Sequence, residues 1–267
     1  MQQVKIGFIG GGNMAEALIR GLLESGVVTD NVMVAELRAE RREYLQRTYG
    51  IAVCNDSAEV VAANSVIVLA VKPQVLEAAL LPLADQFDSD KCLISILAGV
   101  ATAKLEKLIG DKVAVVRVMP NTPALIGAGA AGISGGRYAT AENLEQARQM
   151  FASVGVVEIV PELLLDAVTG LSGSGPAYVY TMIEAMAEGG VLEGLPRDTA
   201  LLLAAQTVAG AAQMVLANNE HPALLRDRVC SPAGTTIAAV QTLERHGIRS
   251  ALIDAVQSSA CRSRELG

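Results

Sequence analysis

A glycine loop near the start of the chain constrains the fold more than any other feature of the sequence. The apolar run at residues 4–9 is followed by Gly10-x-Gly12-x-x-Ala15 and then by a helical pattern. In this spacing Gly10 allows a tight turn, Gly12 leaves room for a pyrophosphate, and Ala15 lets helix and strand pack closely. The first N–H groups of the helix and its dipole then favour the phosphates. The loop therefore predicts a dinucleotide-binding strand–loop–helix unit.

Short apolar runs alternate with helical patterns through the first 161 residues. We expect strands at 4–9, 32–35, 51–53, 66–71, 93–97, 113–118, 130–134 and 156–160, and helices at 14–25, 39–49, 75–83, 102–109 and 141–153. Continuous apolar strands separated by helices are typical of a parallel sheet that is covered on both faces. We therefore predict an α/β fold with a doubly wound (Rossmann) domain over residues 1–161.

The remainder of the chain, residues 162–267, contains no strand-like segment. Its helical patterns are interrupted by turns that contain Gly or Pro at 173–176, 194–196, 221–222, 231–232 and 247. We predict a C-terminal all-helical domain over this range, with the boundary at Pro161.

One stretch of the helical half is uncharged. Residues 199–219 contain no Asp, Glu, Lys or Arg, which is about the length of a membrane span. The stretch is rich in alanine, includes Gln206 and Gln213, and is flanked by charges with no basic bias. A helix that is apolar nearly all round lies either in a membrane or inside protein. We expect this helix to be buried in protein, with no membrane partner.

The charge balance and the cysteines exclude other classes of function. With 28 acidic against 21 basic residues and a net charge of −7, the chain lacks the basic surface that nucleic acid requires. The four cysteines are far apart and lie near no histidine cluster, so we expect no metal site. The first residues show no basic segment followed by an apolar one, and we expect a cytoplasmic protein.

The residues after the second strand leave the choice of nicotinamide cofactor open. Glu36 lies 21 residues past Ala15, where an acid accepts the ribose 2′-hydroxyl of NAD. Arg38, Arg41 and Arg42 follow, and guanidinium groups at this place hold the 2′-phosphate of NADP. An ordinary solvated helix face is the alternative reading for Arg41 and Arg42. Both NADH and NADPH remain candidates.

The helical half offers no strong general base. All six lysines lie at or before Lys112, and the two histidines occupy turn or helix-end positions. The β-hydroxyacid dehydrogenases use a lysine from their helical domain, so oxidation of a hydroxyl group is poorly supported. A cyclic imine is already activated when it is protonated, and needs only orientation and a site for any anionic group. This pattern favours imine reduction.

An anion site is predicted in the helical half. The run Ser-Pro-Ala-Gly-Thr-Thr at 231–236 precedes a helical pattern at 237–245. Ser231 at the N-cap with Pro232 at the first helical position begins a helix, and Gly234, Thr235 and Thr236 offer N–H and hydroxyl donors. A simple capping role is the alternative.

Five segments in this order resemble the pyrroline-5-carboxylate reductases, which catalyse the last step of proline biosynthesis. The resemblance covers essentially the whole chain. The segments are Phe8-Ile9-Gly10-Gly11-Gly12-Asn13-Met14, Ala70-Val71-Lys72-Pro73, Met119-Pro120-Asn121-Thr122-Pro123, Gly170-Leu171-Ser172-Gly173-Ser174-Gly175-Pro176-Ala177 and Ser231-Pro232-Ala233-Gly234-Thr235-Thr236.

The resemblance implies cofactor-binding positions in the first half. In this family the segment at 9–14 cradles the pyrophosphate, the segment at 70–73 runs beside the ribose and nicotinamide, and residues 96–98 and 121 border the nicotinamide. Together with Glu36 and Arg38 from the residue pattern, the predicted set is Ile9, Gly10, Gly11, Gly12, Asn13, Met14, Glu36, Arg38, Ala70, Val71, Lys72, Pro73, Ile96, Leu97, Ala98 and Asn121.

The resemblance also implies substrate-binding positions in the second half. The family binds the substrate carboxylate on the loop that contains Ser231, Gly234, Thr235 and Thr236, and Thr236 lies near the ring nitrogen as the candidate catalytic residue. Family members often have glycine where this chain has Ala233, so a backbone with positive φ there would be strained. Asn219 stands where some members have Glu, and no catalytic role is assigned to it.

The implied partner is a second copy of the chain. Helical domains of this family intertwine into a homodimer, which would bury residues 199–219, and the dimers often assemble to decamers. The expected reaction is reduction of L-1-pyrroline-5-carboxylate to L-proline with NADPH or NADH. The alternatives are another imine or 2-hydroxyacid oxidoreductase, or a protein that senses NAD(P) without catalysis.

Overall fold

The computed structural model describes residues 4–218 and 220–266 and divides the chain into two compact units. The first unit comprises Met1–Ser174 and Gln257–Gly267, and the second comprises Gly175–Val256. The chain leaves the first unit after Ser174 and returns to it at Gln257. Asn219, the last residue of the uncharged stretch, lies outside the described residues.

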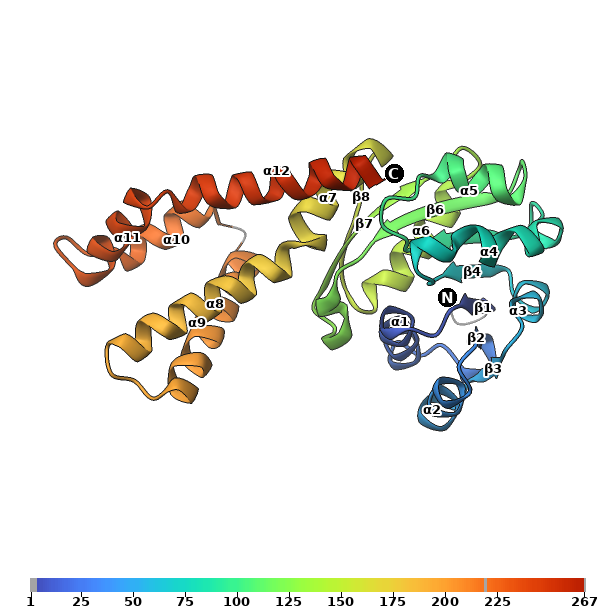
Figure 1. The fold of residues 1–267 in the computed structure, drawn as a ribbon, viewed down its shortest axis with the longest axis horizontal. Helices are drawn as coiled ribbons and strands as arrows, with labels where there is room; N and C mark the ends of the chain where they lie inside the picture. Colours follow the sequence, from blue (N-terminus) through green and yellow to red (C-terminus); the bar gives the residue numbers. More distant parts are fainter. Residues whose placement is uncertain (1–3, 219, 267) are drawn as a thin grey trace. The chain divides into compact units, whose positions relative to one another are not determined.

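The first unit is built on an eight-stranded sheet with the order β3-β2-β1-β4-β5-β6-β7-β8 (Figure 1). The strands are β1 (Ile6–Ile9), β2 (Val32–Ala35), β3 (Ala52–Cys54), β4 (Val66–Leu69), β5 (Cys92–Ser95), β6 (Ala114–Met119), β7 (Gly129–Gly135) and β8 (Gly155–Ile159). β1 pairs in parallel with both β2 and β4, so the strand order switches direction there. Ligands of open α/β sheets bind beyond the carboxyl ends of the strands at such a point.

Helices cover both faces of this sheet. They are α1 (Asn13–Glu24), α2 (Ala39–Tyr49), α3 (Ser57–Ala63), α4 (Leu76–Leu80), α5 (Thr102–Ile109), α6 (Ala141–Ala152) and α7 (Leu165–Val168). Val66 and Val68 of β4 belong to the buried cluster formed with α1, α2 and α6, whereas Ile67 and Leu69 belong to the cluster formed with α3, α4 and α5. Because successive side chains of a strand point to opposite faces, both faces are buried. The predicted doubly wound domain is confirmed.

Three local predictions were incomplete. β7 runs antiparallel to β6 because only residues 120–128, with a single short 3-10 turn, connect them, and a parallel crossover needs a dozen or more. The helix expected at 75–83 is α4 between two 3-10 segments, with Pro82 near the start of the second. α3 was not predicted, although its N-cap Asp56 accepts a hydrogen bond from the amide of Ala58 at 2.8 Å.

A buried ion-pair network ties the end of the chain to the sheet. The guanidinium of Arg117 on β6 lies 3.4 Å from the carboxylate of Glu162 and 3.7 Å from that of Asp166. Asp166 accepts a hydrogen bond of 2.6 Å from the hydroxyl of Ser263, which belongs to the returning segment of α12 (Ile248–Leu266). Glu162 also accepts from the amide and hydroxyl of Thr102. One buried cation therefore holds together β6, α5, α7 and α12.

Replacement of this cation should destabilise the first unit. We expect Arg117→Met to lower the free energy of unfolding by about 3 kcal/mol, because two partly buried carboxylates lose their partner. Urea unfolding at a fixed protein concentration measures the change. Arg148→Met is the matched control, since Arg148 pairs with Glu145 on the exposed face of α6, and it should leave the midpoint unchanged. Equal effects of the two changes would contradict the structural role of Arg117.

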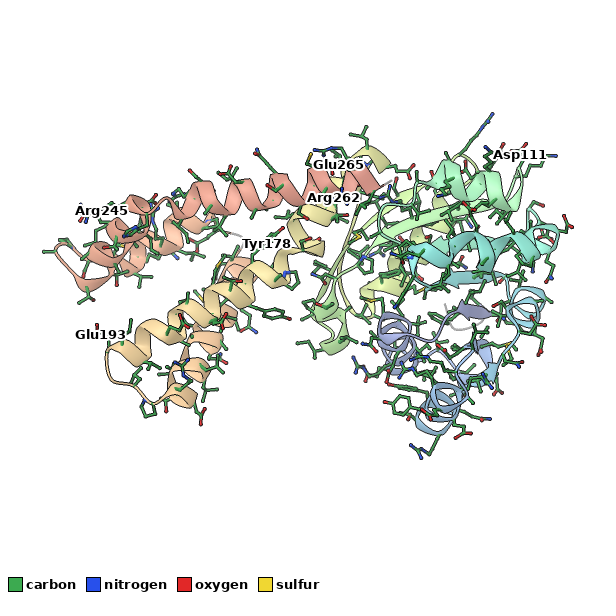
Figure 2. All side chains as sticks on the ribbon, viewed as in Figure 1. Asp111, Tyr178, Glu193, Arg245, Arg262 and Glu265 are labelled. Atoms are coloured by element: carbon green, nitrogen blue, oxygen red, sulfur yellow. The ribbon has the colours of Figure 1, made fainter. Side chains whose placement is uncertain are left out.

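The described residues of the second unit form helices joined by turns, as predicted from residue 163 onward. It consists of α8 (Gly175–Leu192), α9 (Arg197–Asn218), α10 (Pro222–Val229), α11 (Thr235–Arg245) and the first part of α12. Figure 2 shows the side chains of these helices, with Tyr178 near the start of α8 and Glu193 just beyond its end. α8 and α9 pack against each other, and the buried apolar cluster between them contains only Ala187, Ala200 and Ala204.

α9 is long and apolar enough to cross a membrane by length and composition, with a mean hydropathy of 1.7 in its most apolar window. Only 11% of that window is buried, and Leu202 and Leu216 are 70% and 75% exposed. A single copy of the chain therefore does not bury this helix. The prediction that it is buried in protein requires a partner.

Candidate active site

Gly10 lies where three strands meet at the dinucleotide end of the sheet. Its φ is +98°, and a Cβ there would lie 2.7 Å from the carbonyl oxygen of Ala70. Its amide donates to the carbonyl of Ala35 at 2.9 Å, while the amide of Ala70 donates to the carbonyl of Ile9, also at 2.9 Å. Glycine is required here both by the backbone conformation and by the contact with β4.

Gly12 has a different reason to be glycine. A Cβ built at Gly12 meets no described protein atom within 4 Å, so packing within the chain does not require the glycine. Gly12 is also the N-cap of α1, and no side chain caps that helix. Its first amides are thus available to an anion, and the helix dipole favours negative charge there. The open space and the uncapped helix fit the pyrophosphate of a dinucleotide.

Both backbone groups of Gly11 are held by side chains from the β2–α2 region. The amide of Gly11 donates to the carboxylate of Glu36 at 3.2 Å, and its carbonyl accepts from Nε of Arg41 at 2.7 Å. Arg41 in turn donates to the carboxylate of Glu16 at 2.6 Å, which also accepts from the hydroxyls of Tyr44 and Tyr49. We call Glu36, Arg41 and Glu16 the loop clamp.

The charges of the loop clamp are stable at neutral pH. Burial of Glu36 opposes its ionisation, but hydrogen bonds from Arg38 and from the amide of Gly11 outweigh burial and lower its pKa. Burial likewise opposes ionisation of Glu16, and hydrogen bonds from Tyr49 and Arg41 lower its pKa. Both carboxylates therefore remain charged, with Glu36 bonded to the loop and Glu16 to Arg41, and the contact of Glu36 with the cofactor ribose stays a prediction.

The three arginines after β2 have separate roles. Arg41 is half-buried in the loop clamp, and Arg42 donates to the carbonyls of Glu36 and Leu37 at 2.7 and 2.8 Å. Arg38 has a side chain that is 69% exposed and makes its ion pair with Glu36 at 3.1 Å. Of these three, Arg38 is the guanidinium that a 2′-phosphate can reach. The reading of Arg41 and Arg42 as an ordinary solvated face is replaced by structural hydrogen bonds.

Arg38 and Arg41 should differ in their effect on the two cofactors. We expect Arg38→Met to weaken binding of NADPH by about 10-fold and that of NADH by less than twofold, because only NADPH carries the 2′-phosphate. Arg41→Met should weaken both cofactors by a similar factor, because it loosens the shared glycine loop. Fluorescence titration of each cofactor measures the dissociation constants. Equal losses for both cofactors in Arg38→Met would show that Arg38 does not select between them.

The other predicted cofactor residues follow the carboxyl ends of the neighbouring strands. Ala70 and Val71 come directly after β4, and the exposed Lys72 and Pro73 continue from them. Ile96, Leu97 and Ala98 come directly after β5, where the amide of Ile96 donates to the carbonyl of Leu69 at 3.2 Å. The topology thus brings these segments and the 9–14 loop to one edge of the sheet. Leu97 is buried, so only its backbone can face a ligand.

Asn121, which follows β6 at the same edge, is buried and has both ends of its amide engaged. Its Nδ2 donates to the carbonyl of Ser172 at 3.1 Å, and its Oδ1 accepts from the amide of Ala130 at 2.9 Å. These partners are 51 and 9 residues away in the chain. Its side chain therefore joins two segments of the protein, and its predicted place beside the cofactor stays a prediction.

The predicted substrate loop lies in the second unit. Ser231 does not cap a helix: its carbonyl accepts from the amide of Gly234 at 3.0 Å, which closes a turn, and α11 begins at Thr235 with Gly234 as N-cap. The prediction of Ser231 as N-cap was therefore wrong. A Ser-Pro pair can begin either a helix or a turn, and here it begins a turn. No side chain caps α11. A Cβ at Gly234 would collide with Oγ of Ser231.

Ala233 has the positive φ that we expected to strain a residue with a Cβ at this position. Its φ is +53°, in the left-handed region that costs a residue with a Cβ about 1–2 kcal/mol. The turn therefore stores strain next to the free N–H groups of α11. Strain of this kind is found at binding loops whose surroundings fix the conformation.

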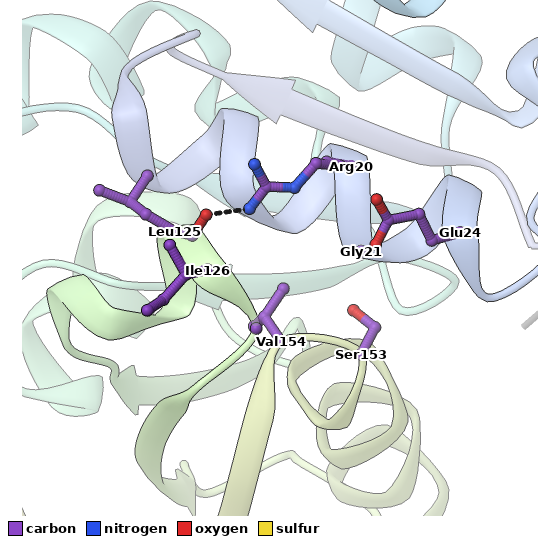
Figure 3. A pocket seen from close by; sticks show the side chains of 8 residues that line it. Arg20, Gly21, Glu24, Leu125, Ile126, Ser153 and Val154 are labelled. Carbon is purple, nitrogen blue, oxygen red and sulfur yellow. Dashed lines mark hydrogen bonds between the residues drawn. The ribbon is translucent and has the colours of Figure 1, made fainter. Parts of the chain in front are cut away.

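A cavity of about 330 Å³ lies toward the other end of α1 (Figure 3). Arg20 and Glu24 of α1 line it together with Leu125, Ile126 and Ser153, and Arg20 donates to the carbonyl of Leu125. None of the predicted site residues lines this cavity. This cavity is therefore not part of the predicted cofactor edge of the first unit, nor of the predicted substrate loop of the second.

Comparison with known proteins agrees with this geometry. Residues 162–266 match the family model described as pyrroline-5-carboxylate reductase dimerisation, and residues 5–99 match that of the coenzyme F420-dependent NADP oxidoreductases. The pyrroline-5-carboxylate reductase of Methanosarcina acetivorans is 47% identical, covering 100% of this chain and 99% of the relative, and that of Escherichia coli is 40% identical over 98% of each.

Solved structures show the same similarity over both units. A pyrroline-5-carboxylate reductase from Coxiella burnetii has a TM-score of 0.95 at 34% identity, covering 99% of this chain and 98% of that chain. The pyrroline carboxylate reductase of Plasmodium falciparum, determined with NADP bound, has a TM-score of 0.88 at 29% identity, covering 100% and 99%.

The sheet, the glycine loop and the appended helices define an oxidoreductase that uses a nicotinamide dinucleotide. The relatives specify which one. The chain belongs to the pyrroline-5-carboxylate reductase family.

Proposed function

We propose that the protein reduces L-1-pyrroline-5-carboxylate to L-proline with NADPH or NADH, the final step of proline biosynthesis. The observation that carries the proposal is a pair of uncapped helix starts. α1 begins at Gly12 and α11 begins at Gly234, and neither helix has a side-chain cap. The first fits the pyrophosphate of the cofactor, and the second fits the carboxylate of the substrate.

The chemistry fits the residues that the chain has. When bound, the nicotinamide cofactor would supply a hydride to the imine carbon of the protonated ring, C2 of the pyrroline and C5 of the resulting proline, while the nitrogen keeps its proton. The chain has to hold the carboxylate at Gly234 and Thr235, to place the hydroxyl of Thr236 toward the ring nitrogen, and to orient the ring. Thr236 is half-buried and Thr235 is exposed, which suits contact with a ligand on both. No lysine is needed for these tasks.

Alternative functions are less well supported. A 2-hydroxyacid oxidoreductase requires a base to remove the hydroxyl proton, and the helical half contains no lysine. A protein that senses NAD(P) without catalysis has no use for a second anion site at α11. A different cyclic imine with a carboxylate is the closest alternative, and the same residues would hold it.

The role of Thr236 can be tested directly. We expect Thr236→Ala to lower kcat/KM for pyrroline-5-carboxylate by about 10- to 100-fold, because it removes a donor at the reacting nitrogen. Thr236→Ser should recover most of the activity, and oxidation of NADPH at 340 nm measures the rate. Thr242→Ala on the same helix is the control, since the Thr242 hydroxyl bonds the carbonyl of Ala238. Wild-type protein without turnover with either cofactor would refute the proposed function, and an unaffected Thr236→Ala variant would refute the role of Thr236.

We also propose that the chain forms a homodimer through the second unit, and that the dimers assemble further into a decamer. The match of residues 162–266 to a dimerisation family supports self-association. The exposed apolar side chains of α9 supply the surface, and a partner that covers them removes the need for a membrane. The cytoplasmic location stays a prediction.

A charge on α9 should separate the copies. We expect Ala209→Glu to convert the wild-type oligomer to monomer at micromolar concentration and to lower its melting temperature, because an unpaired charge would be buried between the helices. Sedimentation velocity and thermal unfolding measure the two effects. Ala62→Glu on the exposed face of α3 is the matched control and should change neither. A wild-type protein that is a stable monomer would contradict the dimer.

A further inference from the structure

The segment that leads from β5 to α5, residues 96–101, is held at both ends by side chains of the first unit. Near its start, Oγ of the buried Ser95 accepts a hydrogen bond from the amide of Leu97 at 3.3 Å. At its end, α5 begins with Thr102, whose amide donates to the carboxylate of Glu162 at 2.7 Å. We call residues 96–101 the β5–α5 segment.

Both oxygens of the Glu162 carboxylate bind Thr102. Oε1 accepts from the amide, and Oε2 accepts from the hydroxyl at 2.6 Å. The N-cap of α5 is Ala101, which has no polar side chain to bind the first amides of the helix. Glu162, 60 residues further along the chain, takes over this task, and a carboxylate at a helix start is also favoured by the helix dipole.

Arg117 on β6 holds this carboxylate from the sheet. Its guanidinium lies 3.4 Å from Oε1 of Glu162, and its side chain is only 7% exposed. Arg117 is also the register partner of Ser95 on the neighbouring strand β5. The supports of the two ends of the β5–α5 segment therefore start from adjacent positions of the sheet, and all of these residues belong to the first unit.

We propose that Glu162 is a positioning residue for the nicotinamide, which acts by fixing the β5–α5 segment and does not touch the cofactor. This inference rests on the proposed function, and in particular on the predicted place of Ile96, Leu97 and Ala98 beside the nicotinamide. A hydride is transferred efficiently only from a ring that is held in place, and an error of about 1 Å can cost about 100-fold in rate. The adenosine half of the cofactor is assigned to the segments after β1 and β2, so Glu162 should act on the nicotinamide half alone.

The first test compares NADPH with 2′-phospho-ADP-ribose, which lacks the nicotinamide. In hydrogen exchange of the wild type, we expect NADPH to protect the amides of residues 97–101 more than the analogue does, because only NADPH reaches this segment. In Glu162→Ala this additional protection should fall by about threefold or more, because the end of the segment is no longer fixed. The affinity for the analogue, measured by calorimetry, should stay the same.

The second test is kinetic. We expect Glu162→Ala to lower kcat for pyrroline-5-carboxylate by about 10-fold, because the ring is less well placed. Glu162→Gln can still accept from the amide of Thr102 and should recover part of this loss. If Glu162→Ala does not fold, Thr102→Val removes only the hydroxyl donor, and it should change protection and kcat in the same direction. Thr102→Ser keeps the hydroxyl and should resemble the wild type.

Asp166→Ala is the matched control. Asp166 is the other carboxylate beside Arg117, at 3.7 Å, and it accepts a hydrogen bond from Ser263 rather than from α5. We expect it to lower the melting temperature as Glu162→Ala does, and to leave the additional protection at 97–101 unchanged. An equal loss of protection in both variants would show a general loosening of the first unit and would contradict the specific role of Glu162.

Other results would also overturn the proposal. Wild-type protein in which NADPH and the analogue protect residues 97–101 equally would show that the segment does not face the nicotinamide. Unchanged protection in Glu162→Ala would show that Glu162 does not hold the segment, and reduced protection with an unchanged kcat would show that the segment does not place the ring. Wild-type protein that binds NADPH without turnover would refute the proposed function alone, because the exchange comparison requires no turnover.

Discussion

The close contact between Gly10 and the carbonyl oxygen of Ala70 sets the geometry on which the first unit depends. A Cβ on Gly10 would lie 2.7 Å from the carbonyl oxygen of Ala70, so only the hydrogen of glycine fits there. The positive φ of Gly10 turns the chain sharply away from β1. β1 and β4 can then remain paired up to their last residues while the loop rises between them. The positions of the segments after β2, β4, β5 and β6 follow from that arrangement, because the carboxyl ends of parallel strands lie at one edge of the sheet. Each predicted cofactor segment of the first unit is placed by this edge.

The two helix starts that we propose as anion sites share one feature. α1 and α11 both have a glycine N-cap, Gly12 and Gly234, and both lack a capping side chain. Side chains cap three other helices, with Asp56 before α3, Thr140 before α6 and His221 before α10, whereas α2 and α5 also begin without a side-chain cap. A capping oxygen would compete with a ligand for the same N–H groups. A glycine N-cap has no side chain that could compete, and this distinguishes α1 and α11 from the uncapped α2 and α5, which begin after Arg38 and Ala101.

The sequence predicted what depends on local pattern and missed what depends on distant contacts. The strands, the glycine loop and the change to helices after residue 162 follow from apolar runs and glycine spacing, and the structure confirms them. Glu36 and Arg41 were read as ligand contacts or surface charge. They lie 25 and 30 residues from Gly11 in the sequence, and no local pattern shows that both form hydrogen bonds with its backbone. Asn121 was assigned from family resemblance, and its partner Ser172 is 51 residues away. The error at Ser231 has another cause, since Ser-Pro begins both a helix and a turn.

The small core of the second unit has a consequence for how the protein folds. Three alanines, Ala187, Ala200 and Ala204, form its buried apolar cluster, and such a core is too small to offset the loss of chain entropy in about 80 residues. The first unit, with its two large clusters, can acquire its structure alone. In the proposed homodimer, a second copy that covers this unit would supply the missing stability. Refolding should therefore proceed in a unimolecular phase followed by a bimolecular one, and the rate of the later phase should increase with protein concentration.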